Sequence, residues 1–209
     1  MKKLLSAAAA FILVSAVSAQ NFEGTIEFKK FSEKDTISYI YHVKGDKVRI
    51  DEIGARSKKV EGSFLIDLKA GTTRFLSHDR QTWGEHKPSQ APAVTGTPKV
   101  EKTSNVKTIQ GYKCTEYIVK STEEGTKISY WMTSGKFTFF KPMLKLLNRK
   151  EKFSIYYQLL PVKDGAFSLA AIQTDLSGKE TGRLEVTKIT KKTVDAAQFT
   201  IPKEYKEFK

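Results

Sequence analysis

The stretch Phe22-Glu-Gly-Thr-Ile-Glu-Phe-Lys29 alternates apolar and polar residues along its whole length. A period of two is the pattern of a β-strand with one face in a core and the other in water. Most later segments repeat the alternation, and short turns such as 45–46 and 123–125 separate them. Strands with such short connections pair antiparallel. The sequence therefore predicts a mainly β, α+β domain built on an antiparallel sheet of about ten or eleven strands.

Residues 138–150 are the exception to this alternation. Pro142 is tolerated only in a first helical turn, so a helix is predicted to begin near Phe140 or Lys141. Three roles are open for it: a core helix that closes the sheet, a lid over a ligand cavity, or a helix on a membrane surface. Its apolar face consists of five residues at helical spacing: Phe139, Phe140, Met143, Leu144 and Leu147.

Large aromatic residues occur on several of the predicted strands. A sheet that curls can gather such rings on its concave face, and a helix that covers this face without filling it leaves an apolar hollow. An acyl chain would suit the hollow, since each buried methylene contributes ~0.8 kcal/mol. A solid core made of the same rings is the alternative. The residues predicted to line the cavity are Phe28, Tyr39, Tyr41, Phe64, Phe75, Trp83, Tyr117, Tyr130 and Trp131.

Residues 1–19 have the parts of an export signal. Lys2 and Lys3 precede an apolar run, and Val17-Ser-Ala19 is a small-residue cleavage site. The apolar run is too short to span a membrane. We therefore expect a single domain of residues 20–209, exported as a soluble monomer to the periplasm or the extracellular space.

The chain is basic. It has 36 Lys and Arg against 23 Asp and Glu, a net charge of +13, and without the two signal lysines the balance is 34 against 23, or +11. No nucleic-acid-binding motif is present, so a nucleic acid is not an expected partner. Outside the cytoplasm a basic surface can meet anionic lipid headgroups or acidic glycans, or serve solubility alone.

No catalytic motif stands out. Cys114 is the single cysteine, and within a strand-like segment it is expected to be a buried hydrophobe rather than a nucleophile. His42, His78 and His86 are too scattered to form a zinc site. We expect no enzyme, no metal and no cofactor. Residues 87–99 contain three prolines and are predicted to be a loop, either a simple excursion or a flap over a cavity.

Three segments carry a family resemblance: the pattern I-x-G-Y-x-C-x-x-Y at 109–117, Tyr130-Trp-Met-Thr133, and Phe199-Thr-Ile-Pro-Lys-Glu-Tyr205. Over about residues 22–208 the chain resembles an uncharacterised family of exported bacterial proteins related to the LolA/LolB-like lipoprotein-carrier superfamily. The resemblance implies an open antiparallel half-barrel with helices over its concave mouth and a hydrophobic cavity inside. It also implies an arginine that helps to hold the lid, a role that Arg49 would take.

These observations predict an envelope protein that binds or carries a hydrophobic ligand, either a lipid, an acyl chain or a lipoprotein. The expected partner is thus a hydrophobic small molecule or lipid, with a membrane surface or a lipoprotein as further candidates. The alternative is a non-catalytic interaction or structural module of the envelope. Its basic surface would then contact a glycan or a partner protein.

Overall fold

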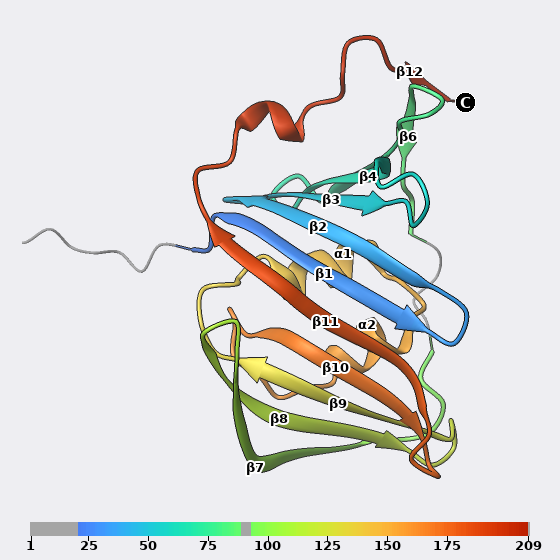
Figure 1. The fold of residues 1–209 in the computed structure, drawn as a ribbon, viewed down its shortest axis with the longest axis vertical. Helices are drawn as coiled ribbons and strands as arrows, with labels where there is room; N and C mark the ends of the chain where they lie inside the picture. Colours follow the sequence, from blue (N-terminus) through green and yellow to red (C-terminus); the bar gives the residue numbers. More distant parts are fainter. Residues whose placement is uncertain (1–20, 89–92, 209) are drawn as a thin grey trace, which may run out of the picture.

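The fold was analysed in a computed structural model, which describes residues 21–88 and 93–208. The predicted signal at 1–19 and positions 89–92 of the predicted loop lie outside the described residues. Among the described residues the strands form one 12-stranded sheet, with both α-helices on one of its faces (Figure 1). None of the described helices is long and apolar enough to cross a membrane.

The elements follow one another along the chain in a mainly β order. The strands are β1 (Gly24–Ser32), β2 (Thr36–Lys44), β3 (Lys47–Ile53), β4 (Val60–Asp67), β5 (Thr72–Ser77), β6 (Thr82–Glu85), β7 (Lys99–Ile109), β8 (Tyr112–Ser121), β9 (Thr126–Thr133), β10 (Phe167–Asp175), β11 (Glu180–Lys191) and β12 (Lys206–Glu207). The helices are α1 (Phe140–Leu147), α2 (Lys152–Tyr157) and the 3₁₀ turn η1 (Ala196–Phe199).

The strand order is β12-β6-β5-β4-β3-β2-β1-β11-β10-β9-β8-β7. All neighbours are antiparallel except β12, which pairs parallel with β6. Among the described strands β12 and β7 have one neighbour each, so the sheet does not close on itself. The predicted open antiparallel half-barrel with helices over one face is therefore confirmed.

The two faces of the sheet follow from the strand register. Phe28 lies opposite Tyr39, and Tyr41 lies opposite Ile50. These side chains meet α1 and α2, and we call their face the inner face. The residues between them point to the other side, which we call the outer face. The C-terminal segment from Asp195 onward packs there against β3, and Arg49 reaches the backbone of that segment.

The first helix begins at Phe140, as predicted, with Pro142 in its first turn. It ends at Leu147, because Asn148 adopts a left-handed conformation with φ 45° and donates its N–H to the carbonyl of Leu144. The second helix was not predicted. Five of its six residues, Phe153 to Tyr157, are buried, so this short helix has no polar face to give a helical period.

Candidate ligand site between the helices and the sheet

Two small cavities lie between the helices and the inner face. Their volumes are about 60 Å³ and about 50 Å³. Both are lined mainly by apolar and aromatic side chains from the sheet and the helices, and the larger one is also lined by Lys30, Arg149 and Glu151. The two cavities share five lining residues and are therefore neighbours: Phe28, Tyr41, Phe140, Phe153 and Leu184.

Four of the nine predicted wall residues line these cavities: Phe28, Tyr39, Tyr41 and Tyr130. The rings of Phe28 and Tyr39 stack with centroids 5.0 Å apart. Phe64 and Phe75 lie farther along the same face, with centroids 5.1 Å apart. Tyr117 also belongs to this face, because it lies opposite Tyr130, but it lines a separate open groove beside β8.

The prediction was wrong for the two tryptophans, which lie on the outer face. Trp83 pairs with Leu76, whose partner in β4 is the outer-face residue Ser63. Trp131 pairs with Glu116, and the ammonium group of Lys107 lies 3.8 Å from its ring centroid. Neighbouring residues of a strand point to opposite faces, so Trp131 must point away from the cavity if Tyr130 lines it.

The predicted apolar face of the first helix packs into the core beneath the sheet. Phe139, Met143, Leu144 and Leu147 are buried in the core, with exposed fractions of 6% or less. Phe140 is half-buried and lines both cavities. Sequence patterns did not identify Leu184, Phe153 or Arg149 as lining residues, although Leu184 follows the alternation of its predicted strand.

Hydrogen bonds join the helices to the sheet at a few points. The Tyr130 hydroxyl donates to the carbonyl of Phe153 over 2.9 Å, and the Lys30 ammonium group contacts Glu151 at 2.6 Å. Glu124, in the turn before β9, accepts hydrogen bonds from Tyr156 and from Lys152, the latter at 2.5 Å. Burial opposes the charge of Glu124, but these two donors outweigh it and lower its pKa to about 2. Burial and the Glu124 hydrogen bond raise the pKa of Tyr156 to about 12.

Arg49 does not hold the helices, so that prediction was wrong. Its side chain points to the outer face, where it donates to Asp51 over 2.6 Å and to the Ser63 hydroxyl over 3.2 Å. It also donates to the carbonyl of Gln198 over 3.3 Å. The arginine on the inner face is Arg149, which lines the larger cavity and lies 5.2 Å from the Phe64 ring centroid. Arg49 therefore fastens the C-terminal segment.

A partly buried chain of polar side chains, here called the outer latch, adds further contacts between the sheet and the C-terminal segment. It consists of Arg49, Asp51, Ser63, His78 and Tyr205. The Ser63 hydroxyl donates to Asp51 over 2.5 Å and lies 2.7 Å from Nε2 of His78. Nδ1 of His78 lies 2.6 Å from the Tyr205 hydroxyl. The contacts fit a neutral histidine that donates to Ser63 and accepts from Tyr205.

The outer latch is a structural arrangement. Ser63 is 0% exposed and Asp51 is 4% exposed, so a substrate cannot reach them. His42 contacts the other oxygen of Asp51 at 3.0 Å, which completes the set of donors to that carboxylate. Cys114 is also 0% exposed, and burial raises the pKa of its thiol. Within the described residues no group of three His, Cys, Asp or Glu side chains could hold a metal ion.

The outer latch predicts a loss of stability as the pH falls below about 6.5, the ordinary pKa of histidine. Burial, and next the charge of Arg49, lower the pKa of His78 in the folded protein. The unfolded chain then binds a proton that the folded chain does not, so the free energy of unfolding falls as the pH drops through the folded pKa. Urea midpoints measured over roughly pH 8 to 5 should show this decrease. His78→Gln should reduce it, and an unchanged pH slope in that variant would contradict the assignment.

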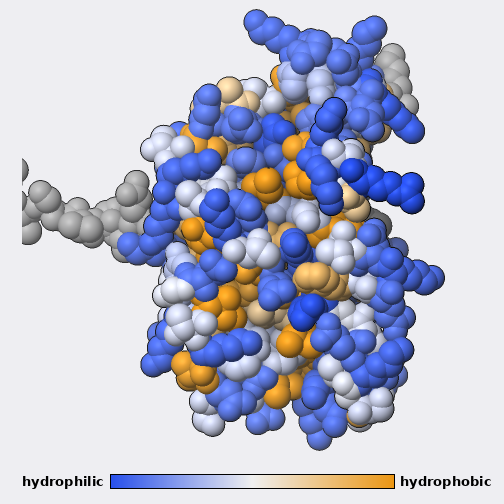
Figure 2. All heavy atoms as spheres, viewed as in Figure 1, coloured by the Kyte–Doolittle hydropathy of each residue, from blue (hydrophilic) through white to orange (hydrophobic). Residues whose placement is uncertain are grey.

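The outer face seen in Figure 2 is mostly hydrophilic, with apolar residues scattered among charged ones.

The comparisons with known proteins agree with this fold. Residues 22–205 match the family described as a domain of unknown function, DUF4412. No curated protein matches the chain. An uncharacterized conserved protein from Thermus thermophilus is 8% identical over 91% of each chain, with a TM-score of 0.56.

Two further structures match with lower scores. A putative outer membrane lipoprotein-sorting protein domain from Vibrio parahaemolyticus is 9% identical, over 88% of this chain and 90% of that one, with a TM-score of 0.37. MucB of the Pseudomonas aeruginosa MucA/MucB complex is 13% identical, over 88% of this chain and 56% of that one, with a TM-score of 0.47. At such identities the likeness concerns the fold alone.

The matched segment covers nearly all of the described chain, including the sheet and both helices. The chain belongs to the DUF4412 family of domains of unknown function.

Proposed function

We propose that this domain binds a hydrophobic ligand, a lipid or an acyl chain, between its two α-helices and the inner face of the sheet. The observation that carries the proposal is the pair of neighbouring apolar cavities with five shared lining residues. The predicted export signal would place this binding in the cell envelope, where a soluble carrier would move such a ligand through an aqueous compartment.

The ligand must displace side chains in order to enter. Pockets for small molecules usually have volumes of about 300–1,000 Å³, and the two cavities hold about 60 Å³ and about 50 Å³. Phe140, Leu144 and Leu147 of α1 occupy the rest of the space. The methylenes of an acyl chain could replace the apolar contacts of these side chains, at ~0.8 kcal/mol each. We therefore propose that α1 acts as a lid that moves when the ligand binds.

Few polar contacts would resist this movement. The Lys30–Glu151 pair beside the helices is partly exposed, with side-chain exposures of 22% and 39%. Ion pairs in such positions contribute about 0–1 kcal/mol. The stronger contacts of Glu124 hold α2, whereas α1 packs against the sheet through its buried apolar residues Met143, Leu144 and Leu147.

Bound lipid and the effect of a larger wall residue test the proposal. Organic-solvent extracts of purified protein are expected to contain a lipid, and the protein is expected to bind a fluorescent fatty acid. Leu184→Trp places a larger side chain at the wall that both cavities share, and should weaken binding about tenfold or more. Leu176→Trp is the matched control, because Leu176 is 47% exposed. An empty extract together with no uptake by the unmodified protein would refute the proposal.

The well-filled interior favours a second candidate, an envelope interaction module without a ligand. The basic surface would then contact an acidic glycan or a partner protein. Retention on an acidic polysaccharide that weakens as salt rises, without lipid binding, would support this second function.

A further inference from the structure

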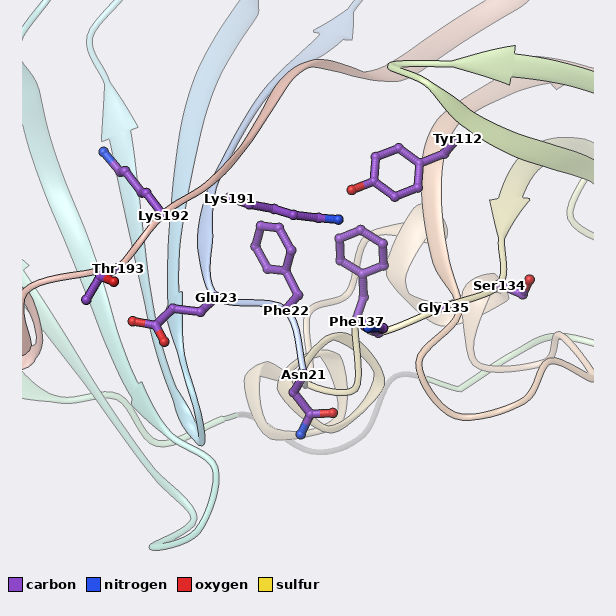
Figure 3. A pocket seen from close by; sticks show the side chains of 11 residues that line it. Asn21, Phe22, Glu23, Tyr112, Ser134, Gly135, Phe137, Lys191, Lys192 and Thr193 are labelled. Atoms are coloured by element: carbon purple, nitrogen blue, oxygen red, sulfur yellow. The ribbon is translucent and has the colours of Figure 1, made fainter. Parts of the chain in front are cut away.

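An open groove of about 490 Å³ lies at the end of the half-barrel where β1 begins and β11 ends (Figure 3). It is separate from the two small inner cavities, and its volume falls within the usual range for a ligand pocket. Four segments far apart in the sequence line it: residues 21–23, Tyr112, residues 134–137 and residues 191–193. Backbone hydrogen bonds fix two of them together, since the N–H of Phe22 donates to the carbonyl of Lys136 over 2.8 Å.

Three aromatic rings form an apolar surface in this groove. The ring centroids of Phe22 and Phe137 are 5.0 Å apart, and those of Tyr112 and Phe137 are 5.7 Å apart. Phe22 and Phe137 are almost fully buried, with exposed fractions of 5% and 2%. The rings are therefore held in place by packing before any ligand arrives.

The charge around these rings is positive. Lys136, Lys191 and Lys192 are exposed and line the groove, and none of them forms an ion pair with another described residue. The ammonium group of Lys191 lies 5.9 Å from the Tyr112 ring centroid, and Figure 3 shows its side chain extending across the rings. Glu23 is the one carboxylate among the lining residues, and it already contacts Lys44 at 3.4 Å and accepts the N–H of Val194 over 3.0 Å.

A row of packed aromatic rings runs from the groove to the two small inner cavities. Phe137 stacks on Phe167 with centroids 4.9 Å apart, and Phe167 meets Phe140 edge-on at 4.5 Å. Phe167 and Phe140 both line the cavity of about 50 Å³. Because Phe137 and Phe167 are each 2% exposed, an apolar chain from the groove would reach the space beneath α1 by displacing these rings.

We propose that the groove binds the anionic head of a single-chain amphiphile, a carboxylate or a phosphate, while the chain passes along the rings to the inner cavities. Lys191 is the principal head-group contact, and Lys136 and Lys192 add positive charge at the rim. This inference rests on the proposed function, because it names the ligand class and the entrance for the same interior site.

Binding of ligands that differ only in their head groups tests this inference. Dodecanoate, dodecyl phosphate, dodecanol and inorganic phosphate are each tested as competitors of a fluorescent fatty acid, with the charged amphiphiles below their micelle-forming concentrations, and inorganic phosphate is expected not to displace it. The two anionic amphiphiles should bind about tenfold more tightly than dodecanol, because an ionised acceptor forms stronger hydrogen bonds with lysine. Lys191→Gln should remove this advantage and Lys191→Arg should keep it. Lys120→Gln is the control, since Lys120 is exposed and does not line the groove.

The outcomes separate the two proposals. Equal binding of dodecanol and dodecyl phosphate, or an unchanged ratio in Lys191→Gln, would overturn the head-group site and leave the interior site standing. Displacement of the fatty acid by inorganic phosphate alone would also overturn it, because the groove would then be a site for free phosphate. If none of the amphiphiles binds, the proposed function itself is refuted.

Discussion

Asp51→Ala is expected to lower the free energy of unfolding by about 3–5 kcal/mol, the cost of breaking a buried ion pair by removing one partner. The Asp51 carboxylate accepts hydrogen bonds from Arg49 and Ser63 and contacts His42. Burial alone would raise the pKa of Asp51, but the hydrogen bonds from His42 and Ser63 and the charge of Arg49 outweigh it, so its pKa is lowered. Alanine would leave the guanidinium group of Arg49 partly buried without its counter-charge.

Asp67→Ala is the matched control for this substitution. Asp67 lies at the end of the neighbouring strand β4 and pairs with Lys47 at 3.5 Å, with side-chain exposures of 31% for Asp67 and 54% for Lys47. Exposed pairs of this kind contribute about 0–1 kcal/mol. Chemical denaturation of both variants measures the difference. Amide hydrogen exchange should also show faster exchange in residues 195–208 for Asp51→Ala. Equal losses in the two variants would show that the outer latch does not stabilise the fold.

The spacing of apolar residues was sufficient to predict the sheet and its antiparallel pairing, from a period of two, and the helix that starts at Phe140, from helical spacing. It failed for β7, because nine of the eleven residues of that strand are exposed and leave no apolar alternation. It failed for α2 for the opposite reason, since nearly every residue of that helix is buried. A hydrophobic period appears in the sequence only where one face of a helix or strand is exposed to solvent and the other face is buried.

Face assignment limited the prediction of the site. The rings of Tyr39, Tyr41 and Tyr130 lie on the inner face and line the small cavities, whereas Trp83 and Trp131 lie on the outer face. Both tryptophans are half-buried on the outer side, so their apolar character could not separate the two faces. The outer latch depends on contacts such as His78–Tyr205, which are 127 residues apart in sequence. Local patterns cannot predict pairings of this kind.

The sequence also could not determine how full the interior is. The same apolar residues of α1 would be found in a helix that covers an empty cavity and in a helix that is packed into a filled core. The structure places them in the core, with cavities of about 60 Å³ and about 50 Å³ remaining. Side-chain packing determines the empty volume between the helices and the sheet. A substitution that enlarges this volume can therefore test whether the interior binds an apolar molecule.

Phe167→Ala is expected to lower the free energy of unfolding by about 3–5 kcal/mol and to create a site for a small apolar molecule. Phe167 is 2% exposed and contacts the rings of Phe137, Phe139 and Phe140. The space vacated by its ring would join the cavity of about 50 Å³ that it now lines. Binding of benzene or indole there should restore part of the lost stability, because a ligand that binds only the folded state stabilises it.

Phe167→Leu serves as the control for Phe167→Ala, since it keeps most of the apolar volume and should lose less stability. Urea unfolding with and without benzene compares the two variants. A gain in the urea midpoint that is larger for Phe167→Ala than for Phe167→Leu would show that the interior accepts an apolar guest once space is made. A loss below about 1 kcal/mol for Phe167→Ala would contradict the close packing of the four rings, and a full loss without any effect of benzene would show that the helices collapse onto the sheet and close the space.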